Sequence, residues 1–142
     1  MTEKYLLALD LGDPDSVERI FPVAQKLASN AGAELHVVSV VPTYSMPIVG
    51  SFFPADFERK ALEAARGELE KVIRSAADNP EAVQGHIAHG LIYEEILRTA
   101  NDIDADLIIM ESHRPALRDY LLGPNAARVV RHARQSVHVH RC

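Results

Sequence analysis

Short apolar runs alternate with amphipathic segments along the chain. Three runs, Tyr5–Leu9, Leu35–Val41 and Leu107–Met110, are mainly apolar, which is typical of strands that helices cover on both faces of a parallel sheet. A weaker strand is predicted over Val83–Ala88, because a glycine and a histidine interrupt it. The last run, Ser136–Arg141, alternates valine with histidine and therefore predicts an edge or half-covered strand.

Helical periodicity lies between these runs. Apolar positions three and four apart predict helices over about 15–31, 55–77, 92–101 and 125–134. Asp15 with Glu18 resembles a capping box at the start of the first helix. Pro22 should kink that helix and Gly32 should end it. The strict alternation of strands and helices predicts an α/β fold: one domain over 1–142, with an open five-stranded parallel sheet and helices on both faces.

Composition narrows the class of protein. The chain has 142 residues, 47% of them apolar, and a net charge of −5, which argues against a nucleic-acid binder. The single cysteine, Cys142, excludes a disulfide within the chain and suits the reducing cytoplasm. Met1–Lys4 leads directly into a strand pattern, so we expect no signal peptide. Because no apolar run approaches the roughly 18 residues that span a bilayer, we expect a cytoplasmic protein without membrane insertion.

Candidate ligand contacts follow the predicted strands. In open α/β sheets, ligands bind beyond the carboxyl ends of the strands, where the strand order reverses. Asp10 follows the first strand, Val41 ends the second, and residues 111–114 follow the fourth. Gly123 precedes the last helix, where a glycine permits close approach to a phosphate and the helix dipole favours an anion. These positions predict a ligand cleft.

Each polar candidate in this cleft has a second interpretation. Asp10 either holds a ribose hydroxyl or a metal, or caps a turn. His113 and Arg114 either contact phosphate or are solvated. Asn125 is an N-cap, a ligand contact, or both. The chain lacks a Gly-x-Ser-x-Gly elbow and a phosphate-binding Gly-x-x-x-x-Gly-Lys loop, and its seven histidines lack a carboxylate or cysteine pattern beside them, so we expect neither catalytic residues nor a dedicated metal site.

One pattern extends over nearly the whole chain. It comprises the strand that ends in Asp10, Val40-Val41-Pro42, residues 105–110, and Glu111-Ser112-His113-Arg114 followed after eight residues by Gly123-Pro124. This pattern resembles the universal stress protein family, and the string from 121 to 133 is closest to a short-loop subgroup with Ser-His-Arg-Pro.

The resemblance implies five parallel strands, a homodimer, and ATP or AMP, with Mg²⁺ as a further possibility, in the strand-end cleft. It places adenine and ribose near Ala8, Leu9 and Asp10, and the adenine edge near the backbone at Val41. The phosphates would face the remaining site residues: Ser112, His113, Arg114, Gly123, Pro124 and Asn125.

Two departures from the family pattern concern the phosphates. Glu111 stands where the family has a small residue, and its carboxylate should repel a triphosphate unless a cation intervenes or the side chain turns away. Pro124 stands where the family has a hydroxyl residue, so a hydroxyl and a backbone N–H are lost there. We therefore expect weaker phosphate binding than in nucleotide-binding relatives.

Two functions remain open at this stage. The first is a nucleotide-binding regulatory or stress-response protein with little or no catalysis. The second is an interaction protein of the same fold that acts through its dimer and the 42–54 loop, whose apolar side chains either fold back on the domain or bind an unidentified partner. The resemblance implies that the dimer forms through strand 136–141, and His138 and His140 would then cluster and loosen it below about pH 6.5.

Overall fold

The computed structural model describes residues 2–42, 57–112 and 124–141. Within these ranges, five strands form one sheet in the order β3-β2-β1-β4-β5, and every neighbouring pair is parallel. The strands are β1 (Lys4–Ala8), β2 (Glu34–Pro42), β3 (Val83–Gly90), β4 (Leu107–Ser112) and β5 (Ser136–Arg141). The predicted parallel α/β sheet is confirmed, with β3 and β4 extending two residues beyond their predicted ends.

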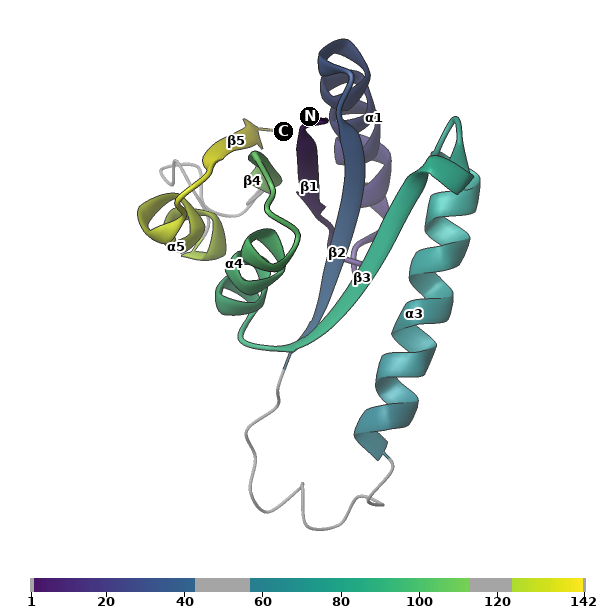
Figure 1. The fold of residues 1–142 in the computed structure, drawn as a ribbon. Helices are drawn as coiled ribbons and strands as arrows, with labels where there is room; N and C mark the ends of the chain where they lie inside the picture. The colour runs from purple at the N-terminus through teal and green to yellow at the C-terminus, as the bar shows by residue number, and fades with distance from the viewer. Residues whose placement is uncertain (1, 43–56, 113–123, 142) are drawn as a thin grey trace.

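Helices cover both faces of the sheet, as expected (Figure 1). They are α1 (Pro14–Ala31), α3 (Phe57–Ala76), α4 (Ile92–Asp102) and α5 (Pro124–His132), and a short 3₁₀ turn, η1 (Pro80–Ala82), leads into β3. The helices α1 and α3 pack on one face, and α4 and α5 on the other. The connecting helices therefore change from one face of the sheet to the other where the chain passes from β3 to β4.

The ends of α1 differ in one respect from the prediction. Asp13 is the N-cap, because its side chain accepts a hydrogen bond from the Ser16 backbone N–H at 3.3 Å, and Pro14 occupies the first turn. The capping box expected at Asp15 is therefore wrong. The helix begins one residue earlier, because proline is favoured at the first helical position. At the other end Gly32 adopts φ 66°, the left-handed cap that glycine favours, as predicted.

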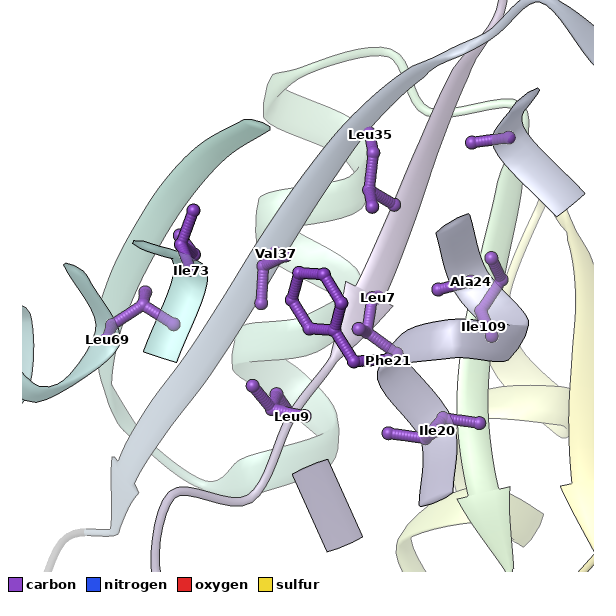
Figure 2. Packing of buried hydrophobic residues seen from close by; sticks show 11 residues of the cluster. Leu7, Leu9, Ile20, Phe21, Ala24, Leu35, Val37, Leu69, Ile73 and Ile109 are labelled. Atoms are coloured by element: carbon purple, nitrogen blue, oxygen red, sulfur yellow. The ribbon is translucent and has the colours of Figure 1, made fainter. Parts of the chain in front are cut away.

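Each face of the sheet has its own apolar core. On the α1 and α3 side, Phe21 is fully buried against Leu7 and Val37 (Figure 2). On the α4 and α5 side, Leu6 and Val129 are fully buried. Consecutive residues of β1 thus enter opposite cores, which explains why this strand is apolar throughout.

The strand order places the functional site. From β1 the chain adds β2 and β3 on one side, and then crosses to add β4 and β5 on the other. The order therefore reverses between β1 and β4, and the helices that follow these two strands, α1 and α5, lie on opposite faces of the sheet. Of the strand-end candidates named from the sequence, Asp10, Glu111 and Ser112 lie at this reversal.

Candidate functional site

A cavity of about 610 Å³ opens at the carboxyl ends of β1, β2 and β4. Its size falls within the range of roughly 300–1,000 Å³ typical of small-molecule sites. The lining comes from four places in the sheet edge and its helices: residues 8–13, residues 38–41, residues 110–112, and the helical residues Ser16, Ala65, Ile92, Ile96, Asn125 and Ala126. The cavity therefore occupies the reversal of strand order.

The cavity brings together most of the predicted site residues that the structure describes. Six of them line it: Ala8, Leu9, Asp10, Val41, Ser112 and Asn125. Pro124 begins α5 beside Asn125, and Asn125 therefore lies in the first turn of the helix, so the N-cap role considered for it is wrong. The predicted contacts His113, Arg114 and Gly123, and the loop after Pro42, lie outside the described residues.

The cavity has an apolar side. Val38, Val40 and Val41 at the end of β2 face it, together with Ile92 and Ile96 of α4. The Leu9 backbone N–H donates to the Val38 carbonyl at 2.9 Å, which holds the β1 end against β2. This side offers apolar side chains to an apolar or aromatic ligand group.

Asp10 shapes the loop that follows β1. Its Oδ1 accepts a hydrogen bond from the Gly12 backbone N–H at 2.8 Å, and its carbonyl accepts one from the Asp13 N–H at 3.3 Å. A Cβ at Gly12 would lie 3.2 Å from Asp10 Oδ1, so glycine suits this tight turn. The turn-capping interpretation of Asp10 is therefore confirmed, and Oδ2 has no partner within the described part of the chain.

An arginine that sequence reasoning missed lies beside the polar end of the cavity. Arg19 of α1 binds Glu111 of β4 through two hydrogen bonds, from Nε to Oε2 at 3.1 Å and from Nη2 to Oε1 at 2.8 Å. The same Nη2 also donates to Asp13 Oδ2 at 3.2 Å. The hydrogen bonds to Glu111 raise the pKa of Arg19 further above its ordinary value, so the guanidinium stays charged. The sequence predicted that Glu111 repels phosphate unless a cation intervenes or the side chain turns away, and Arg19 is a cation that binds this carboxylate.

A second polar cluster lies outside the cavity. His36 of β2 and His86 of β3 face each other, with His36 Nδ1 3.0 Å from His86 Nε2 and the rings stacked. His36 is only 4% exposed, and its Nε2 has no hydrogen-bond partner among the described residues. Burial lowers the pKa of both histidines, and His86 lowers that of His36 further. Residues 2–42, 57–112 and 124–141 hold no group of three or more side chains suited to a metal ion.

The alternation of valine and histidine predicted for β5 places these residues on opposite faces of the strand. Val137 and Val139 pack against the α4 and α5 core, while the rings of His138 and His140 stack with centroids 6.0 Å apart. No helix in the described ranges is long and apolar enough to cross a membrane.

Comparisons with known proteins agree on one family. A profile of the Universal stress protein family matches residues 1–141. Universal stress protein G of Salmonella typhimurium is 27% identical over 137 residues, which is 94% of each chain.

Solved structures share the fold. The chain MJ0577, from Methanocaldococcus jannaschii, superposes with a TM-score of 0.73 at 24% identity, covering 100% of this chain and 97% of that one. A universal stress protein in complex with cAMP gives 0.63 at 18% identity, with 96% and 95% covered. The protein from Archaeoglobus fulgidus in complex with dAMP gives 0.55 at 20% identity, with 96% of each chain covered. From its fold and the match over nearly its whole length, the chain belongs to the universal stress protein family.

Proposed function

We propose that this protein binds an adenine nucleotide, ATP or AMP, in the strand-end cavity and acts as a regulatory or stress-response protein of the cytoplasm. The observation that carries the proposal is the cavity itself: it lies at the reversal of strand order, with an apolar wall on one side and polar groups on the other. Binding, rather than turnover, is its proposed role.

The two sides of the cavity suit the two parts of a nucleotide. The apolar wall that includes Val40, Val41 and Ile92 suits the adenine ring, and Asp10 Oδ2 suits a ribose hydroxyl. Ser112 and Asn125 lie at the opposite side, where the start of α5 favours an anion. His113, Arg114, Gly123 and Pro124 would complete the phosphate contacts. Two proteins of the same fold were solved with cAMP and dAMP, which supports the choice of ligand class.

Calorimetry with ATP, AMP and adenosine, each with and without Mg²⁺, tests the proposal. We expect saturable binding to wild type and weaker binding of all three ligands to Asp10→Asn, because the ribose contact is common to them. The matched control is Asp106→Asn, an aspartate at the opposite end of the sheet that accepts a hydrogen bond from the Lys4 N–H. No heat and no thermal shift at millimolar ligand would exclude this function.

A second candidate is an interaction protein that works as a homodimer through β5. It is favoured by the place of β5 at the sheet edge, where strand N–H and C=O groups face away from β4. A two-fold axis would pair this strand with its mate in an antiparallel, self-complementary way. Sedimentation of wild type and of a chain with Val137→Pro tests it, since proline removes a strand N–H donor. A monomeric wild type at micromolar concentration, or a folded, fully dimeric Val137→Pro, would exclude this interface.

A further inference from the structure

Two serines in the wall of the strand-end cavity are almost completely buried. Ser16 of α1 is 6% exposed and Ser39 of β2 is 4% exposed, and both line the cavity. Neither hydroxyl makes a hydrogen bond within the described part of the chain. Neither is sealed off, since the fully enclosed side-chain atoms without a partner in these ranges are His36 Nε2 and Gln135 Oε1. A ligand that fills the cavity would therefore remove water from both hydroxyls and would have to hydrogen-bond them.

The alternation of side chains along β2 places Ser39 on the α1 and α3 side of the sheet. Val38 and Val40 belong to the core under α4 and α5, so the residue between them faces the other way. Ser16 comes from α1, which covers the same face as Ser39. The two serines therefore lie across the strand ends from the apolar side of the cavity, which includes Val40 and Ile92.

The groups around the two hydroxyls favour a neutral ligand group over a phosphate. The Ser16 backbone N–H, which a phosphate would use at the start of a helix, already donates to Asp13 Oδ1 at 3.3 Å and to the Asp13 carbonyl at 3.0 Å. Asp10 also lines the cavity, and its Oδ2 has no partner among the described residues. This carboxylate opposes a negative charge and accepts a hydrogen bond from a neutral hydroxyl.

The sugar is the part of a nucleotide that carries neutral hydroxyls. We propose that Ser16 and Ser39 are specificity-determining residues that hydrogen-bond the sugar and make the cavity prefer ribonucleotides over 2′-deoxyribonucleotides. A ribose hydroxyl that donates its proton to Asp10 can still accept one from a serine. With 2′-deoxyribose, the buried serine hydroxyls would lose water without gaining a partner. This inference rests on the proposed function, which places a nucleotide in the same cavity.

Calorimetry with ATP and 2′-deoxy-ATP tests the assignment in wild type, Ser16→Ala, Ser39→Ala and the double variant. We expect wild type to bind ATP about tenfold more tightly than 2′-deoxy-ATP, because the deoxy ligand leaves a buried hydroxyl unpaired. Each single variant should lower this ratio, and the double variant should bring it below about threefold by weakening ATP alone. Ser75→Ala is the matched control and should keep the ratio, because Ser75 is exposed on α3 and its hydroxyl donates to the Val72 carbonyl at 3.2 Å.

Thermal unfolding of the free variants separates this role from a structural one. The two hydroxyls have no partner in the described part of the chain, so Ser16→Ala and Ser39→Ala should unfold at or above the wild-type temperature. A wild type that binds neither ligand overturns the proposed function and this inference with it. Equal affinities of wild type for the two ligands, or a wild-type ratio that persists in the double variant, overturn this inference alone. Where the double variant does not fold, the ratios in the two single variants decide in the same way.

Discussion

Acidification should destabilise the fold through the histidine pair between β2 and β3. Burial lowers the pKa of His36 and His86 below that of an unfolded histidine, about 6.5. Lys4 lowers the pKa of His36 as well, and Glu34 opposes these effects. Stability from the neutral pair is therefore complete above about pH 6.5 and falls as the pH drops below it, because the unfolded chain binds protons that the folded chain refuses.

The size of the effect follows from the number of protons. Each histidine that is protonated only in the unfolded chain lowers the free energy of unfolding by about 1.4 kcal/mol per pH unit, and two such histidines lower it by about 2.7 kcal/mol per pH unit. The decline ends when the pH reaches the folded-state pKa, since both states then bind the proton. The hydrogen bond between the rings adds to this preference, because it needs one nitrogen without a proton.

Urea unfolding at pH 7.5, 6.5 and 5.5 measures this slope. The variant His36→Gln/His86→Gln should lose less stability between pH 6.5 and 5.5 than wild type does. His132→Gln is the matched control, because His132 is exposed on α5 and the His36–His86 pair remains intact in this variant. The same pH slope in wild type and in the double variant would refute the argument.

Three further predictions concern packing, backbone and assembly. Phe21→Ala should lower the free energy of unfolding by about 3–5 kcal/mol in urea titrations, because the fully buried ring leaves a cavity. Gly32→Ala should lower the free energy of unfolding by about 1–2 kcal/mol, because Gly32 has a left-handed φ of 66°. Gly67→Ala inside α3 should raise it by about 0.5–1 kcal/mol, because the new Cβ meets nothing within 4 Å. Changes of the same sign in the two variants would contradict this reasoning. If the homodimer forms through 136–141, a chain truncated after Gln135 should sediment as a monomer, and a folded truncated chain that stays fully dimeric would contradict this interface.

Most of the fold could be predicted because its signals are local. The residues of β1 are apolar on both sides of the strand, since Leu6 and Leu7 enter different cores, and that pattern is visible without any partner. Local signals were less reliable at element ends. β3 continues to Gly90 because it pairs with β2 as far as Pro42, and this pairing depends on another strand rather than on the sequence of β3 itself.

The residues of the candidate site also fall into those that the sequence predicts and those that it does not. Asp10 and Ser112 could be placed from the sequence, because parallel topology brings the carboxyl ends of β1 and β4 to one edge whatever the side chains are. Arg19 could not, since its partner Glu111 is 92 positions away and nothing in the periodicity of α1 separates this arginine from a solvated one. Glu111, taken alone, predicted repulsion of phosphate. In the structure its carboxylate binds Arg19, which also binds Asp13, so the effect of Glu111 on a ligand depends on its partners. The charge at the end of the cavity therefore depends on residues of both α1 and β4. A substitution at Glu111 is interpretable only together with one at Arg19.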